Sequence, residues 1–166
     1  SAHSDGLTCT PFPTNSVVAS IEVMETMAPL LVWKKELRRD SGGPGKFRGG
    51  FGQEIVIEVK SRKPLTMSVI GERFDFPPEG MAKGLDGSPN HVEMTNGERP
   101  IPHKGRAQLS PGDIIRLSFA GGGGHSAPEE RDLEAVQDDL RNGTISQEAA
   151  DTIYQLSRRR RNQLAD

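Results

Sequence analysis

Charged and hydroxyl side chains capable of chemistry are set in a glycine-rich run between Arg38 and Gly52. Glycine allows positive φ angles and close backbone approach, so such a loop can present backbone N–H groups to an anion or a carbonyl oxygen. The guanidinium of Arg48, planar and able to form two parallel hydrogen bonds, suits a carboxylate or a phosphate. The alternative is a tight irregular turn leading into a strand, because Gly-Gly and Pro-Gly pairs are turn signals.

A second glycine run, residues 121–124, ends at His125. At the end of a strand this imidazole could carry a proton or bind a carbonyl group, although a plain polar loop residue is the alternative. Ser41 could act as a nucleophile only with a histidine base nearby, and Asp40-Ser41-Gly42 is also ordinary turn chemistry. We predict as catalytic residues Asp40, Ser41 and His125. We predict as substrate-binding residues Arg48, Gly42, Gly43, Gly122 and Gly123.

Two other groups of side chains invite weaker hypotheses. His3, Asp5 and Cys9 could form a transition-metal ligand set, but no Cys-x-x-Cys or His-Glu-x-x-His spacing supports them, so we predict no metal site. The basic run at residues 158–161 has no interleaved aromatic residues, and a solvated helix end explains it better than nucleic-acid binding.

Hydrophobic periodicity predicts the elements that position these residues. Strands are expected over residues 31–37, with Leu31, Trp33 and Leu37 on one face, and over 53–60, so the glycine-rich run joins two strands. Further strands are expected over residues 66–70, 91–94, 106–109 and 114–119. A short helix is expected over residues 20–27, ended by Pro29.

Two helices are expected near the C-terminus. Asp132 is placed to cap the first, which would bury Leu133, Val136 and Leu140, and Ser146 is placed to cap the second, with Ala149, Ile153 and Leu156 inward. The fold class is therefore α+β. We divide it into a β-rich irregular sheet region with an N-terminal loop, a short helix and glycine-rich loops, residues 1–125, and a C-terminal helical hairpin with a basic tail, residues 126–166.

The composition indicates a thin core, because hydrophobic residues make up 33 % and aromatic residues 5 % of 166 residues. We expect a piece of a larger protein whose other parts complete the burial. A net charge of −2 gives no reason to expect nucleic-acid or membrane partners. A single cysteine excludes an internal disulfide and favours a cytoplasmic location.

Three segments in order resemble the C-terminal part of the hydantoinase B/oxoprolinase family. They are residues 37–50 (LRRDSGGPGKFRGG), Pro111-Gly112-Asp113 leading to the glycines at 121–124, and residues 131–146. A leucine, Leu133, stands where relatives often have proline, which is harmless because leucine is a good helix former. Family proteins are several times longer, so their upstream residues have no counterpart here.

The resemblance implies ATP-dependent hydrolysis of a cyclic amide of the 5-oxoproline or hydantoin class. Phosphorylation of the amide carbonyl oxygen would remove the resonance that makes the ring unreactive and would create a leaving group. ATP and Mg would be bound by a partner subunit or domain of hydantoinase A type. The chain alone is then expected to have neither ATPase nor lactamase activity.

Two alternatives stay open at this point. One is an ATP-dependent ketone carboxylase subunit of the same family, which the visible residues do not distinguish from a hydrolase. The other is a non-catalytic assembly module, which the thin core favours.

Overall fold

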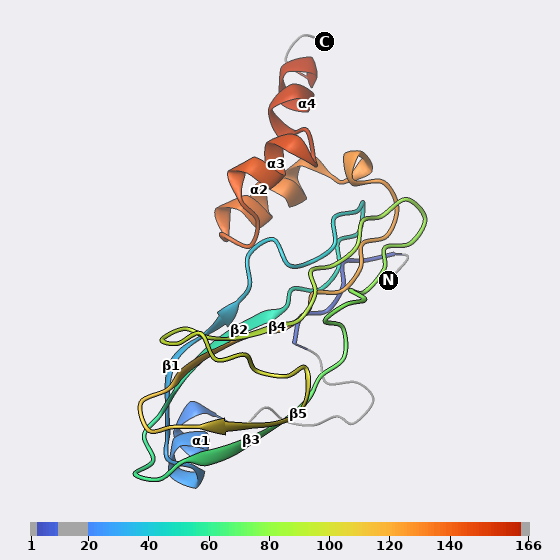
Figure 1. Ribbon diagram of the computed structural model, residues 1–166. Helices are drawn as coiled ribbons and strands as arrows, with labels where there is room; N and C mark the ends of the chain where they lie inside the picture. The colour runs from blue at the N-terminus through green and yellow to red at the C-terminus, as the bar shows by residue number, and fades with distance from the viewer. Residues whose placement is uncertain (1–2, 10–19, 164–166) are drawn as a thin grey trace.

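Six strands form two antiparallel sheets that lie one above the other in the computed structural model, which describes residues 3–9 and 20–163 (Figure 1). The larger sheet has the order β1-β2-β6-β4, and β3 pairs with β5 in the smaller one. The strands are β1 (Leu30–Leu37), β2 (Gln53–Val59), β3 (Leu65–Ile70), β4 (His91–Met94), β5 (Lys104–Leu109) and β6 (Ile114–Ser118). All six predicted strands and the mixed α and β fold class are confirmed.

The apolar faces of the two sheets pack against each other, as alternation along the strands requires. The buried residues are Val59, Val92, Met94, Ile101, Leu109 and Ile115. From β3, the alternate side chains of Leu65, Met67 and Val69 pack against this cluster. The pleat of each strand thus decides which side chains are buried.

A β-bulge changes which residues of β1 share a face of the sheet. The register of β1 on β2 shifts between Val32 and Lys34, so Trp33 has no partner in the ladder. Trp33 is 63 % exposed, and its indole N–H donates to Glu58 at 2.9 Å. Leu31 lies opposite Glu58 and Leu37 lies opposite Gln53, and these two residues are on opposite faces of β2. The prediction that Leu31, Trp33 and Leu37 share one face is therefore wrong, because one extra residue in a strand interrupts the alternation.

Helix α1 (Ile21–Met27) confirms the predicted N-terminal helix. The hydroxyl of Ser20 accepts a hydrogen bond from the Val23 amide at 3.4 Å, and Pro29 follows shortly after the last helical residue. This helix contacts β1.

The C-terminal region contains a 3-10 turn, η1 (Pro128–Glu130), and the helices α2 (Leu133–Arg141), α3 (Gln147–Thr152) and α4 (Leu156–Gln163). Asp132 caps α2 and Ser146 caps α3, as predicted. The predicted second helix is two helices, however. The chain turns at Gln155, whose φ is +54°, and the carboxylate of Asp151 accepts hydrogen bonds from the amide and hydroxyl of Ser157.

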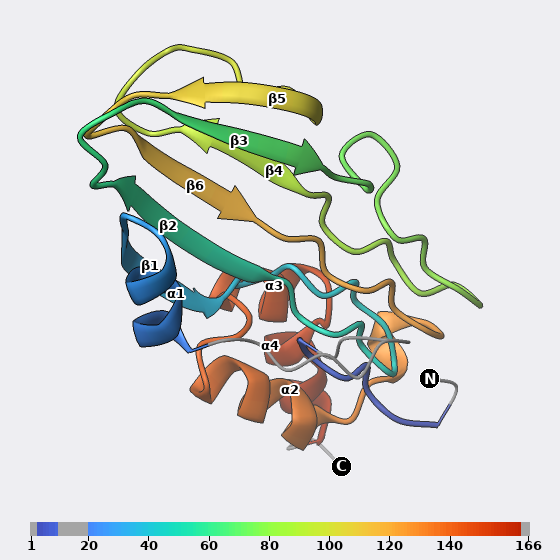
Figure 2. The ribbon, with the colours of Figure 1, turned by 90° about the horizontal axis from the view of Figure 1, so that it is seen from below.

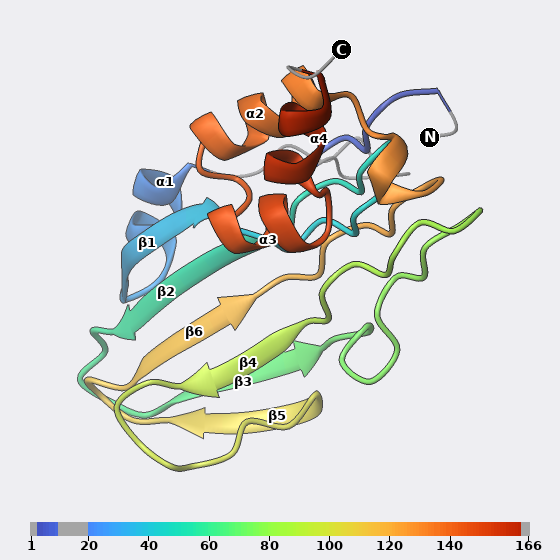
Figure 3. The same cartoon turned by 90° about the horizontal axis from the view of Figure 1, so that it is seen from above.

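The helices form a second core of their own. Its buried residues are Phe51, Leu133, Val136, Ile145, Ala150, Tyr154 and Leu156. Phe51 belongs to the glycine-rich run, so this core joins the helices to the end of the sheet. Figures 2 and 3 show α2, α3 and α4 on one side of the molecule and β5 on the opposite side.

Hydrogen bonds such as the one from Arg48 to Asp139 connect residues on either side of the predicted boundary between residues 125 and 126. The division into two regions stays a prediction. Among the helices that the structure describes, none combines the length and apolar character needed to cross a membrane.

Candidate functional site

Three glycine-rich segments lie side by side between the sheets and the helices, as Figure 1 shows in the middle of the molecule. They belong to residues 38–52, 79–88 and 119–126, and they are linked by backbone hydrogen bonds outside any regular strand. Gly43 donates to the carbonyl of Gly122 at 2.8 Å, and Gly122 donates to that of Gly50 at 2.8 Å. The Gly124 amide donates to Leu85 at 2.9 Å. We call these three segments the glycine layer.

The layer is so thin that a side chain would collide with neighbouring backbone. A Cβ atom at Gly121 would lie 1.8 Å from the carbonyl oxygen of Ser41, and one at Gly49 would lie 1.9 Å from that of Gly122. Only glycine permits such close approach. The same backbone crowding, at 2.0 to 2.5 Å, surrounds three of the predicted substrate-binding residues, Gly42, Gly43 and Gly123.

Asp40 and Ser41 fix the start of this layer to its neighbours. The hydroxyl of Ser41, which is completely buried, donates to the Arg38 carbonyl and accepts from the Gly52 amide at 2.9 Å. Asp40 has a φ of +56°, and its carboxylate accepts from the Ser146 amide at 2.8 Å. In this arrangement both side chains hold backbone in place.

His125 lies at the other end of the layer and is partly exposed. Its backbone exchanges two hydrogen bonds with Phe47, at 2.8 and 3.1 Å, and the two rings lie 6.5 Å apart. The Nδ1 atom lies 2.9 Å from the hydroxyl of Ser126. Within the part of the chain that the structure describes, no hydrogen bond joins His125 to Ser41.

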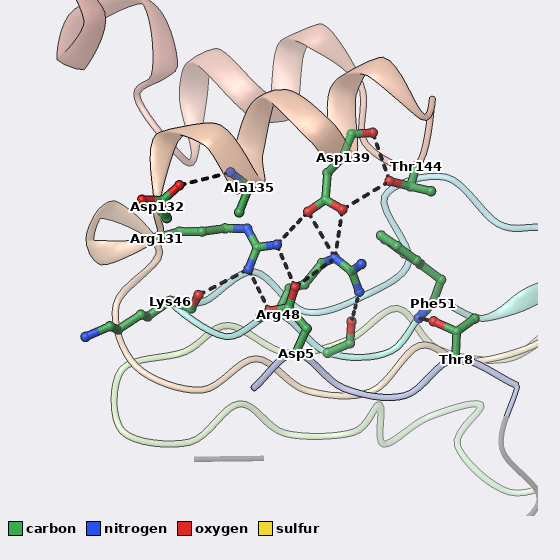
Figure 4. Close-up of polar contacts among 11 residues, drawn as sticks. Asp5, Thr8, Lys46, Arg48, Phe51, Arg131, Asp132, Ala135, Asp139 and Thr144 are labelled. Carbon is green, nitrogen blue, oxygen red and sulfur yellow. Dashed lines mark hydrogen bonds and ion pairs between the residues drawn. The ribbon is translucent and has the colours of Figure 1, made fainter. Parts of the chain in front are cut away.

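A network of four charged side chains lies between the glycine layer and helix α2 (Figure 4). Arg131 binds Asp5 with both terminal nitrogens at 2.7 Å, and one of these nitrogens also donates to Asp139 at 2.8 Å. The Nε atom of Arg48 donates to both oxygens of Asp139 at 3.0 and 3.1 Å. We call Asp5, Arg48, Arg131 and Asp139 the charge network.

Because the charge network is largely buried, each charged group in it depends on its oppositely charged neighbours for stabilisation. The side chain of Arg131 is 3 % exposed and that of Asp139 is 9 % exposed. Burial alone would raise the pKa of the Asp5 carboxyl, but hydrogen bonds and charge from Arg131, with help from Arg48, outweigh it and lower the pKa. Burial would likewise lower the pKa of Arg131, and Asp5 and Asp139 reverse that effect. Both shifts favour the charged forms of Asp5 and Arg131.

Arg48 was predicted to contact a carboxylate or a phosphate of a ligand. In this structure it contacts the carboxylate of Asp139, and its guanidinium lies 4.0 Å from the centre of the Phe51 ring. The Arg48 side chain is 16 % exposed. Its role toward a substrate stays a prediction.

A cleft of about 580 Å³ adjoins the charge network. Its walls include Lys46 and Phe47 from the glycine layer and Arg131, Asp132 and Arg159 from the helical side. Cationic side chains, anionic side chains and the ring of Phe47, which lies next to His125, line the cleft. A small polar molecule with an apolar part could therefore fit here.

The donor sets of the described residues do not fit a divalent cation. No group of three or more His, Cys, Asp or Glu side chains is placed to hold a metal ion among residues 3–9 and 20–163. In particular, Asp5 binds Arg131 and Arg48, and the structure does not gather His3, Asp5 and Cys9 into a ligand set. The amides of the glycine layer that could cradle a phosphate, such as Gly43 and Gly124, donate to backbone carbonyls. These two amides are therefore already used within the glycine layer.

Arg131 and Asp139 were not singled out by sequence reasoning. One signal was available: Asp139 follows Val136 by three residues and therefore lies on the apolar face of its helix. A carboxylate on such a face requires a buried cation.

Comparisons with known proteins add to this picture. The hydantoinase B/oxoprolinase family profile matches residues 1–128. An uncharacterized protein of Methanocaldococcus jannaschii is 35 % identical over 138 residues, which cover 82 % of this chain and 24 % of that protein. The 5-oxoprolinase PfmaA of Pestalotiopsis fici is 35 % identical over 70 % of this chain and 10 % of its own length. The chain thus spans about a quarter, or less, of these relatives.

Solved structures agree with the sequence matches. Caprolactamase subunit beta of Pseudomonas jessenii is 30 % identical over 141 residues, 81 % of this chain and 24 % of that subunit. A crystal structure of the ATP-dependent caprolactamase from the same organism aligns with a TM-score of 0.67 at 30 % identity over the same shares of the two chains. Acetone carboxylase, without nucleotide, aligns over 92 % of this chain and 25 % of its own with a TM-score of 0.71. At 22 % identity, that likeness shows the fold alone.

Proposed function

This chain belongs to the hydantoinase B/oxoprolinase family, and we propose that it is part of a larger enzyme that hydrolyses a cyclic amide in an ATP-dependent reaction. The observation that carries the proposal is the match of more than four fifths of the chain to a caprolactamase subunit, together with the match to a 5-oxoprolinase. Both names denote enzymes that open a lactam, a ring whose amide resonance makes the carbonyl carbon a poor electrophile.

We propose that ATP and Mg are held by a partner subunit or domain of hydantoinase A type. The resemblance implies this arrangement. The solved caprolactamase is named ATP-dependent, which supports the nucleotide requirement. A cytoplasmic location belongs to the same proposal.

Within the chain, we propose different roles for the predicted catalytic residues. His125 is partly exposed and lies beside Phe47, which lines the cleft, so it is our candidate for proton transfer to the substrate. Ser41 and Asp40 are positioning residues, because each holds backbone of the glycine layer in place. Substrate binding by Arg48 and by the predicted glycines is part of the same proposal.

The complete enzyme with its partner subunit tests this proposal. ATP consumption is measured with 5-oxoproline, hydantoin, caprolactam and acetone with bicarbonate as candidate substrates. We expect turnover with at least one lactam. Turnover with acetone alone would replace hydrolysis by carboxylation, and ATP consumption with none of them in an active complex would contradict the proposal.

The role of His125 has its own test in the same enzyme. His125→Gln should lower kcat by about 100-fold or more, as expected for loss of a general acid or base. His91 on β4, whose side chain is 59 % exposed and lies 3.3 Å from Glu93, supplies the control, and His91→Gln should leave kcat unchanged. Equal kcat values for both variants would exclude His125 as the proton carrier.

A further inference from the structure

The two-stranded sheet has an edge that no described strand covers. β3 pairs with β5 along one side, and no other strand of the described chain pairs with it. Figures 2 and 3 show that β3, and not β5, is the strand nearer to β6 and β2. The free edge of β3 therefore runs along the inner face of the larger sheet.

An apolar trough of about 340 Å³ lies beside this edge. Leu65 and Met67 of β3 form one bank, the turn from Met27 to Leu30 forms the other, and Ile57 and Leu117 contribute to the floor. A second hollow of about 320 Å³ continues past Met67 and Leu117 toward Ile70 and Phe119. The two hollows share residues, so we treat them as one trough.

Large apolar side chains at the trough are exposed to an unusual degree. Met27, beside the first hollow, is 82 % exposed, and Phe119, beside the second, is 43 % exposed. Isolated exposed apolar residues are normal, but exposed apolar side chains around an apolar trough beside an unpaired strand edge mark an interaction surface.

We propose that a β-strand from the same polypeptide, outside these 166 residues, pairs with the free edge of β3 and fills the trough with its alternate side chains. A strand suits both features, because the edge offers backbone hydrogen-bonding groups and the trough accepts every second side chain. The smaller sheet would then have three strands and would cover more of the inner face of the larger sheet.

The lengths of the relatives argue for this occupant. The chain covers 24 % of caprolactamase subunit beta, so about three quarters of that protein lies outside the matched part. This inference rests on the proposed function only in that the chain works within a longer protein. Its test needs neither substrate nor ATP, so its failure can be told apart from failure of the proposed reaction.

Amide hydrogen exchange at single-residue resolution, measured on the complete protein, tests the pairing. In a strand with one antiparallel partner, only alternate amides donate to that partner. We expect all amides of Leu65–Ile70 to be protected. A pattern in which every second amide exchanges fast would overturn the proposal.

A photo-crosslinking residue at Thr66, which is exposed and lines the trough, identifies the occupant. We expect a cross-link to the same polypeptide outside these residues. A cross-link to the ATP-binding subunit or to a second copy would overturn the assignment, as would a native polypeptide with no further residues.

A pair of charge insertions supplies the matched control. Met27→Lys should make the outward amides of β3 exchange more than about tenfold faster. Leu7, which is 80 % exposed and lies on the glycine layer away from the trough, is the control, and Leu7→Lys should leave β3 unchanged. Equal effects of the two variants on β3, or no effect of either, would count against a strand in the trough.

Discussion

Replacing Asp139 by asparagine should destabilise the fold much more than the same change at its neighbour Asp138. Asp139 receives three hydrogen bonds of 2.8 to 3.1 Å from two guanidinium groups. Asparagine preserves the shape but removes the charge, which leaves Arg131 and Arg48 to share Asp5. Breaking a buried ion pair by removing one partner costs about 3–5 kcal/mol, and we expect a loss in this range.

Asp138 provides the internal control on the same helix. Its side chain is 51 % exposed, and it pairs with Arg141 at 3.1 Å on the surface. Such a pair contributes at most about 0.5 kcal/mol, so Asp138→Asn should have little effect.

Urea unfolding followed by the far-ultraviolet circular dichroism of the helices measures both variants. Comparison of the midpoints at equal slope gives the difference in the free energy of unfolding. Equal midpoints for Asp139→Asn and Asp138→Asn would refute the reasoning, because they would show that the charge network contributes no more than a surface ion pair.

Three further predictions follow from other parts of the structure. Gly121→Ala should lower the free energy of unfolding by about 3 kcal/mol or more, because its Cβ would lie 1.8 Å from a backbone oxygen. At Gly97 the atom nearest to an added Cβ would be a side-chain carbon at 3.6 Å. Gly97→Ala is therefore the control and should be nearly neutral in urea unfolding. The Asp5 carboxyl has a lowered pKa in the folded state. Its contribution to stability is therefore present above the unfolded pKa of about 4 and is lost as the pH falls through the folded pKa. Acid unfolding curves of Asp5→Asn should lack that part of the pH dependence. Burial raises the pKa of Tyr154 to about 12, so the contribution of this phenol to stability is complete below the unfolded pKa of about 10 and is lost as the pH rises through about 12. Phenolate absorbance reports the titration directly, since the chain has one tyrosine. A titration midpoint near pH 10 would contradict the burial argument.

Local features of the sequence determined most of the regular structure. The caps at Asp132 and Ser146 depend on hydrogen bonds to amides two or three residues away, and the alternation of apolar residues in β2 depends on the pleat of a single strand. The glycine-rich run was correctly predicted to join two strands, because turn signals act over a few residues.

The tertiary structure decided what could not be found by local reasoning. The bulge at Trp33 depends on the register with β2, and the break between α3 and α4 depends on the contacts of Asp151 with Ser157 and on the burial of Tyr154. Neither is signalled by periodicity within one element.

The candidate site divides in the same way. The sequence by itself marked Arg48 as a residue for an anion and the glycines as positions of close approach, because both properties belong to the residue type. Only the fold supplied the partners: Asp139 lies 91 positions from Arg48, and Asp5 lies 126 positions from Arg131. Contacts across such separations depend on how all the intervening elements pack, and no local pattern contains that information.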